Sequence, residues 1–319
     1  MLKQAFVGLV VFLVIAVPGV LAQTKGQKVI RRAQPPKFTA DRTFFEDAFK
    51  EGLVGERPAN LGQPVTVVAA TGSTPATGSG TAAGPSGAGW PALISAGTIE
   101  DEVKATKLLI DQGVTTPSDF AGKGYKVARR DFSTLAMLFA IINEYDGEVR
   151  WKSDAAIARD TFARTAANAK VGTVQVFNEA KQRKAELQDL LSGSSPFTEK
   201  AVEPKNNWAA ICDRAPLMQY LEKVWEPEMK PLLSDKAQFT ANAEKIAHDA
   251  EMFAAIGEVL AKEGMMDADS DEYKAFCHRL RDAAKEIAEA AKSKNFDAAS
   301  KASTEIGKSC VECHENYRA

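Results

Sequence analysis

Two cysteines and a histidine late in the sequence have the types and spacing for one specific piece of chemistry. They form the CxxCH motif Cys310-Val311-Glu312-Cys313-His314. The two thiols can add to the vinyl groups of a haem, and the adjacent imidazole can reach the iron as an axial ligand. The motif therefore predicts one covalent haem c, held by thioether bonds to Cys310 and Cys313, with His314 bound to the iron.

Other CxxC chemistries need features that this sequence lacks. A thioredoxin-like redox pair opens a helix beside a strand, whereas this motif closes a long helical pattern. A tetrahedral zinc site needs a second pair of ligands at short spacing. Haem attachment is the interpretation that the spacing favours.

The first residues predict an exported protein. Lys3 gives a positive start, residues 5–17 are almost continuously apolar, and Val20-Leu21-Ala22 has small residues where signal peptidase cleaves. We therefore expect a signal peptide at 1–22 and a periplasmic or otherwise exported mature protein. The apolar run is short for a membrane span, so no stable span is expected after cleavage.

The composition is that of an ordinary soluble protein. It is 45% hydrophobic and 26% charged, with a formal net charge of -2. This balance argues against nucleic acid as a partner.

The chain divides into a low-complexity region and a helical region. Residues 23–89 contain a tract of Gly, Ser, Thr, Pro and Ala, which predicts a flexible linker. From Trp90 onward Ala, Glu, Lys and Leu are abundant, and Phe239, Ile246, Phe253 and Leu260 fall on one helical face. The sequence predicts an all-α fold.

The helical region has an internal duplication with a period near 118 residues. Offsets that drift by one or two residues are typical of two copies of one fold with different loop lengths. The matches pair Trp90 with Trp208, Asp131 with Asp249, Arg164 with Arg281, and Phe177 with Phe296. We expect tandem antiparallel four-helix bundles at 90–195 and 203–319.

The alignment of the copies predicts that only the second carries haem. Residues 191–195, Leu-Ser-Gly-Ser-Ser, fall where the second copy has its CxxCH motif. We expect helices in the second copy near 206–232, 236–262, 270–292 and 296–317, the first of them bent by its three prolines, Pro216, Pro227 and Pro231.

A haem motif in the last helix of an all-α domain resembles the class II c-type cytochromes, the cytochrome c′ family. The stretch from Arg214 through Leu217-Met218 to Trp225 is similar to the first-helix signature of that family. The resemblance covers 203–319 in full and, through the duplication, 90–195 in outline. It implies a four-helix bundle with the haem near one end.

The resemblance also implies further haem contacts. Met218 corresponds to the residue that faces the distal side of the iron, where a thioether either ligates iron or stands off. Arg214, one turn earlier, is expected to pair with a haem propionate, and Arg318 to approach the haem edge. Either arginine could instead be a solvated surface charge.

Two cysteines and two histidines depart from the family pattern. Cys212 and Cys277 could form a disulfide in an oxidising compartment, or stay as buried thiols, since their helices are diagonal in a simple bundle. His248 and His278 do not fall at the position facing the distal iron and are interpreted as helix-surface imidazoles.

These features predict a monohaem cytochrome that transfers single electrons between redox partner proteins and is not an enzyme. The alternative is a five-coordinate haem protein that binds a small gas such as nitric oxide or carbon monoxide. A third hypothesis makes the haemless copy a docking surface. The resemblance allows a homodimer, although the two copies could instead pack on each other within one chain.

Overall fold

The computed structural model describes residues 89–198 and 205–318, and every regular element in these ranges is a helix. The predicted all-α fold is therefore confirmed for the described part of the chain, where no strand occurs. The predicted signal peptide at 1–22 and all but the last residue of the predicted linker at 23–89 lie outside the described residues. The described helices belong to one compact unit.

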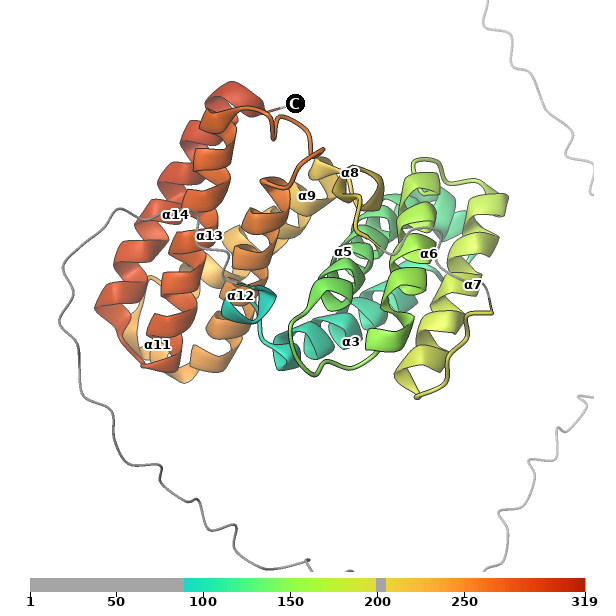
Figure 1. Cartoon of the computed structure of the whole chain (residues 1–319), viewed down its shortest axis with the longest axis horizontal. Helices are drawn as coiled ribbons and strands as arrows, with labels where there is room; N and C mark the ends of the chain where they lie inside the picture. The colour runs from blue at the N-terminus through green and yellow to red at the C-terminus, as the bar shows by residue number, and fades with distance from the viewer. Residues whose placement is uncertain (1–88, 199–204, 319) are drawn as a thin grey trace, which may run out of the picture. The chain divides into compact units, whose positions relative to one another are not determined.

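The first half of this unit is built mainly from α3, α5, α6 and α7, which lie side by side in Figure 1. In chain order its elements are the 3-10 turn η1 (Trp90–Ala92), α3 (Ala96–Gly113), α4 (Pro117–Asp119), the π-helical η2 (Phe120–Gly124), α5 (Tyr125–Glu144), the 3-10 turn η3 (Lys152–Asp154), α6 (Ala155–Asn168) and α7 (Val174–Leu191).

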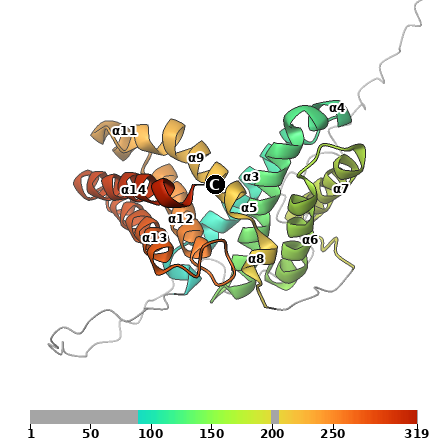
Figure 2. The same cartoon turned by 90° about the horizontal axis from the view of Figure 1, so that it is seen from above.

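The second half has a similar order of long helices, but its π-helical segment lies at a different place along the chain. Its elements are α8 (Trp208–Ile211), α9 (Arg214–Val224), the π-helical η4 (Trp225–Met229), α10 (Lys230–Leu232), α11 (Lys236–Ala241), α12 (Ala243–Leu260), α13 (Asp271–Lys292) and α14 (Phe296–Tyr317). Figures 1 and 2 both show α12, α13 and α14 as neighbours.

These elements match the predicted helix ranges closely, apart from the extended backbone at Cys212 and Asp213, which separates α8 from α9, and two further breaks. The helix expected at 206–232 changes from α to π geometry at Trp225–Met229, which contains Pro227. The helix expected at 236–262 is interrupted at Asn242, where φ is -115° and ψ is 22°. Helix α11, which ends at this second break, packs against α14, the helix that bears the CxxCH motif.

Side-chain caps mark the start of six helices, including the long helices α3, α7, α13 and α14. In each case a side-chain oxygen accepts a hydrogen bond from the backbone N–H three residues later, which satisfies one donor that the first turn leaves unpaired. The capping residues are Ser95, Thr116, Thr173, Asp235, Ser270 and Asn295.

Helices α5 and α12 form the centre of their respective halves. Every residue of α5 from Asp131 to Ile142 is buried, and α12 is buried on nearly all sides from Asp249 to Leu260. A helix that is apolar around its whole circumference belongs inside the protein. Close packing reaches the backbone at Gly257, where an added Cβ would lie 2.8 Å from the backbone nitrogen of Arg281 in α13.

Two matching aromatic contacts support the predicted duplication. The rings of Phe120 and Phe177 lie 5.6 Å apart at 66° in the first half. Those of Phe239 and Phe296 lie 5.7 Å apart at 64° in the second half. Each ring of the second pair follows its counterpart by 119 residues. The same pair of helices is therefore joined by the same edge-on contact in both halves.

Each half packs its leading segment against the other half. The Ser95 backbone N–H donates to Glu251 Oε2 in α12 at 2.9 Å. In the opposite direction, the Asn206 amide donates to the Ala140 carbonyl oxygen in α5 at 2.7 Å, and Arg159 in α6 donates to Asn206 Oδ1 at 2.8 Å. In each half, the segment before the first long helix therefore forms hydrogen bonds with the other half.

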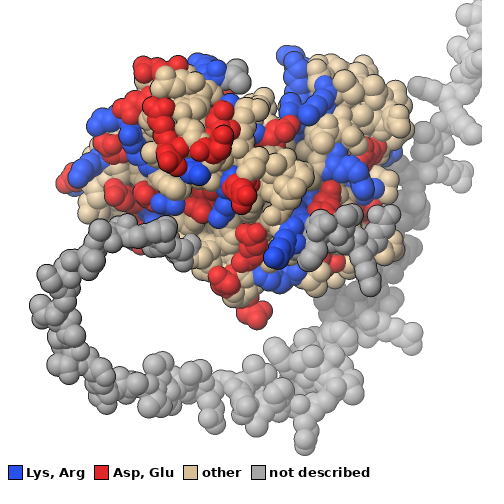
Figure 3. All heavy atoms as spheres, turned by 45° about the horizontal axis from the view of Figure 1, so that its top comes forward, with Lys and Arg blue, Asp and Glu red and all other residues tan. Residues whose placement is uncertain are grey.

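The surface shows no large single-sign region on the face drawn in Figure 3, where positive and negative side chains are interspersed. Among the described residues no helix combines the length and the apolar character needed to cross a membrane.

Candidate functional site

The CxxCH residues lie in the last two turns of α14. Cys310 and Cys313 are half-buried and pack against the hydrophobic core, whereas Val311 is 60% exposed and His314 is exposed. Because residues three apart share a helix face, the two thiols point to the same side of α14. The helix therefore presents both thiols inward and leaves the imidazole accessible.

The thiols lie in apolar, partly desolvated surroundings. Burial raises the pKa of Cys310 to about 11, with a further contribution from the charge of Glu226. Burial also raises the pKa of Cys313, although the charge of Arg214 opposes the shift. Both side chains are thus neutral thiols near pH 7 in the protein without haem.

Helix α9 and its π-helical extension lie opposite the thiol face. Cys310 lies within electrostatic reach of Glu226 in η4, and Cys313 within reach of Arg214 at the start of α9. Met218, half-buried against the same core, falls between these two positions on α9. The structure therefore brings Glu226 and Arg214 near the two thiols, and Met218 lies on the stretch of helix between those two residues.

Arg214 is held by partners other than a propionate. It is 9% exposed, and its Nη1 lies 2.5 Å from Asp267 Oδ2. Its guanidinium lies over the ring of Tyr273, 5.5 Å from the centroid. Asp267 has a φ of 64°, a left-handed conformation that Asp tolerates better than most residues. The guanidinium is therefore oriented at this end of the helices by groups from α13 and the loop before it.

Sequence reasoning missed Tyr273 and assigned no site role to Cys277 on α13. Tyr273 is 1% exposed, burial strongly raises its pKa, and its hydroxyl lies beside the Arg214 guanidinium and the Cys277 thiol. Its ring lies 5.2 Å from that of Tyr317. Burial raises the pKa of Cys277, which also feels the charge of Cys313, to about 12. The four-residue spacing of Tyr273 and Cys277 was the available signal, because it places both on one face.

The remaining predicted residues lie apart from the thiols or at the edge of the site. Cys212 and Cys277 are both buried and free, so the disulfide left open by the sequence is not formed in this structure. Cys212 lies before α9, beside Asp213. Arg318 is exposed and directly follows α14.

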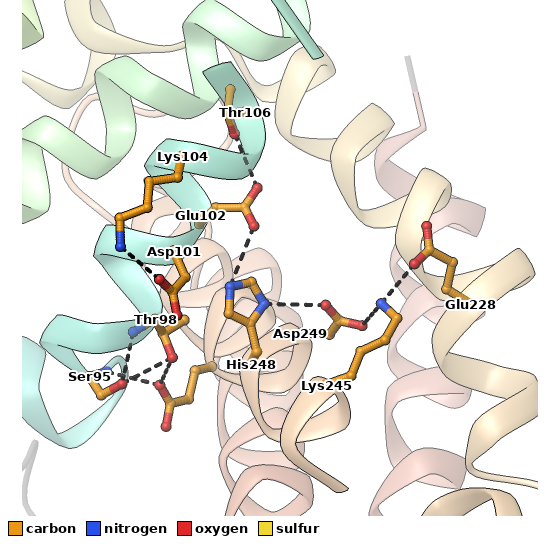
Figure 4. Close-up of polar contacts among 11 residues, drawn as sticks. Ser95, Thr98, Asp101, Glu102, Lys104, Thr106, Glu228, Lys245, His248 and Asp249 are labelled. Atoms are coloured by element: carbon orange, nitrogen blue, oxygen red, sulfur yellow. Dashed lines mark hydrogen bonds and ion pairs between the residues drawn. The ribbon is translucent and has the colours of Figure 1, made fainter. Parts of the chain in front are cut away.

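The two histidines outside the motif differ from each other. His278 is half-buried on α13, and burial together with the charge of Arg281 lowers its pKa. His248 is not the free surface imidazole that the sequence indicated. Its side chain is 25% exposed, with Nε2 3.7 Å from Glu102 Oε2 and Nδ1 3.4 Å from Asp249 Oδ1. Figure 4 shows the ring between these two carboxylates.

The surroundings of His248 form a charged cluster between the halves. Burial would lower the pKa of His248, but Asp249 and Glu102 outweigh it and raise the pKa. Burial raises the pKa of Glu102 itself, which also lies beside Tyr220. Lys245 lies 2.8 Å from Asp249 and 2.7 Å from Glu228. The cluster is a contact between α3, α9 and α12, not part of the thiol face.

Comparison of the chain with protein-family models, with curated proteins and with solved structures gave no match.

Proposed function

We propose that this protein is an exported monohaem c-type cytochrome that carries single electrons between redox partner proteins. The observation that supports the proposal most strongly is the position of Cys310 and Cys313 on one half-buried face of α14, opposite the part of α9 that contains Met218. Two neutral thiols one turn apart, with an adjacent histidine, are the donor set that covalent haem attachment requires.

The residues present fit such a group. Cys310 and Cys313 would hold the porphyrin by thioether bonds, and His314, which is exposed on α14, would provide the proximal nitrogen. The buried hydroxyl of Tyr273 and the oriented guanidinium of Arg214 are polar groups near the thiol face, since the charge of Arg214 acts on Cys313. A bound haem would supply reversible one-electron chemistry.

The chain's own residues would tune that chemistry. Leu217 and Leu221 of α9 are buried, and these apolar side chains would limit the access of water to a haem bound beside that helix. Met218 provides a thioether that either ligates the iron or leaves the position open. An open position favours the alternative function, binding of nitric oxide or carbon monoxide.

The proposal includes two tandem four-helix bundles, at 90–195 and 203–319, of which only the second holds haem. The matching Phe contacts and the similar helix order support the repeat. Ser192, Gly193 and Ser194 follow α7 in the first half, near the positions where the CxxCH motif extends α14 in the second. That end of the first half has no thiol or imidazole to hold a haem.

The test is haem attachment in the full chain exported by a host that matures c-type cytochromes. We expect denatured protein to keep one covalent haem by mass and absorption, and to cycle between oxidised and reduced spectra. The double variant C310A/C313A should lose the covalent haem, whereas the matched control C212A should keep it. A wild-type chain that matures without covalent haem would overturn the proposal.

A further inference from the structure

The first half of the molecule contacts α9, the helix that carries Met218, at three points along its length. At the start, Asp213 Oδ2 lies 2.6 Å from Arg129 Nη2 and 3.6 Å from Lys170 Nζ. Further along, Tyr220 lies beside the carboxylate of Glu102 in α3. At the third point, the charge of Lys223 acts at longer range on a buried carboxylate of α5.

That carboxylate belongs to Asp131, and the charge of Lys223 near the end of α9 acts on it. Asp131 also pairs with Arg130, whose Nε donates to Asp131 Oδ1 at 2.7 Å. These polar interactions therefore run from Asp213, directly before α9, to Lys223 near its end.

The positions of these contacts divide α9 into two faces. With about 100° of rotation per residue, Asp213, Tyr220 and Lys223 lie within about 80° of one another around the helix. By the same count Met218 lies about 140° from Asp213. The first half thus holds one side of α9, while Met218 projects from a different side, toward the thiol-bearing half.

The two carboxylates that make these contacts are unusually well buried. Glu102 is 6% exposed and Asp131 2% exposed, and burial raises the pKa of each. Asp131 Oδ2 has no hydrogen-bond partner in the described part of the chain. Burying carboxylates is unfavourable compared with apolar side chains of similar size, so their presence indicates a role in setting the register between elements.

We propose that the first half acts as an intramolecular brace on α9, and that Glu102 and Asp131 are positioning residues that fix the distance of Met218 from the haem. This inference rests on the proposed function for the haem itself. In this arrangement the haemless copy sets the distal environment of its neighbour's cofactor through contacts on the back of α9.

Glu251 provides a matched control at the same junction. It is 5% exposed and also joins the two halves, accepting hydrogen bonds from the Ser95 backbone at 2.9 Å and the Thr98 hydroxyl at 2.6 Å. Its ion pair is with Lys292 of α13 at 2.9 Å. The described contacts of Glu251 therefore stabilise the junction without involving α9.

The first measurement is amide hydrogen exchange in the full chain, with or without haem. We expect Glu102→Ala to increase amide exchange across residues 217–224 by about tenfold, because local opening of α9 becomes easier when a contact is lost. Glu102→Gln keeps the volume and an acceptor for Tyr220 and should restore most of the protection. Glu251→Ala should leave exchange in this segment at the wild-type level.

The second measurement is the reduction potential of the haem-loaded protein. We expect Glu102→Ala to shift the potential and Glu102→Gln to restore it, while Glu251→Ala leaves it unchanged. The brace would be overturned if amide exchange in α9 is unchanged in Glu102→Ala, or if Glu251→Ala has an equal effect. It would also be overturned if Glu102→Ala alters the exchange but leaves the reduction potential unaltered. A wild-type chain without haem would instead overturn the proposed function, and the potential could then not depend on Glu102.

Discussion

The indole rings of Trp90 and Trp208 pack 5.8 Å apart at an angle of 49°. The two tryptophans occupy corresponding positions in the two halves. Trp90 Nε1 donates to Glu144 Oε2 at 3.0 Å within its own half, while Lys262 of the other half lies over its ring at 5.2 Å. Glu144 and Lys262 are themselves 118 residues apart. Corresponding residues therefore meet each other across the junction.

Contact between corresponding residues is the property of an isologous interface, in which residues on the two-fold axis meet their own symmetry mates. Glu102 and Tyr220, also separated by 118 residues, are a second such pair. The junction within this chain thus has the organisation of a symmetric dimer, although its residues have diverged. The resemblance had left open whether the copies pack within one chain or between chains, and the described contacts lie within one chain.

The tryptophan pair gives the first prediction. Both indoles are buried, with 6% and 5% exposed, so Trp90→Phe and Trp208→Phe should each destabilise the fold. A double-mutant cycle by urea unfolding should show a coupling free energy of about 0.5–1.5 kcal/mol, as for other aromatic pairs. Phe120 and Trp90, which belong to different aromatic contacts, provide the comparison pair. Additive effects for Trp90 and Trp208 would mean that their contact does not hold the halves together.

A pair of glycines gives the second prediction. Gly257 has no room for a Cβ against α13, so Gly257→Ala should destabilise the protein by about 1–3 kcal/mol through overpacking. A Cβ added at Gly307 in α14 would point into open space. Gly307→Ala should therefore stabilise the protein by about 0.5–1 kcal/mol through helix propensity. Chemical denaturation measures both. The prediction is wrong if the two substitutions change stability in the same direction.

The sequence predicted the features that depend on local pattern. The apolar period found the buried positions of Phe239, Ile246, Phe253 and Leu260, all of which are buried in the structure. The last helix, expected near 296–317, is α14 (Phe296–Tyr317) in the structure. Such predictions succeed because, in a helix, the spacing of residues in the sequence determines which face each side chain occupies.

The features that depend on distant segments could not be obtained in the same way. His248 looks like a surface residue of its own helix, but Glu102, far away in the sequence, lies beside it in the fold. Similarly, the partner of Arg214 is Asp267, which comes from a loop with a left-handed residue. Neither pairing leaves a period or a motif in the sequence, because each arises from the packing of distant segments.

His248 gives the third prediction, a dependence of stability on pH. Its folded pKa is raised above the ordinary value, mainly by Asp249, with Glu102 and Asp101 also contributing against burial. The protonated ring therefore stabilises the fold at low pH, and this contribution is lost as the pH rises above the ordinary value of 6.5. We expect the unfolding free energy of wild type to fall between about pH 6 and pH 8, and His248→Gln to reduce that fall.

His278 provides a control of opposite sign for this titration. Because its pKa is lowered, its contribution to stability increases as the pH rises toward 6.5. His278→Gln should therefore remove a rise of the unfolding free energy with increasing pH. His248→Gln should instead remove a fall of the unfolding free energy with increasing pH. Denaturation curves at several pH values distinguish the two, and identical pH profiles for the two variants would contradict the assignment of His248 to the charged cluster.

The last prediction concerns the residue opposite His314. Met218 lies half-buried on α9. Met218→Leu removes the thioether while nearly conserving the side-chain volume, so the free energy of unfolding should change by less than about 1.5 kcal/mol. If the thioether ligates iron, the ferric spectrum of the haem-loaded protein changes from low spin to high spin in the variant. Met229→Leu is the control, because Met229 is fully buried in η4 and should keep the wild-type spectrum. A wild-type spectrum that is already high spin would show that Met218 stands off the iron, and carbon monoxide binding should then be rapid because no protein ligand has to leave first.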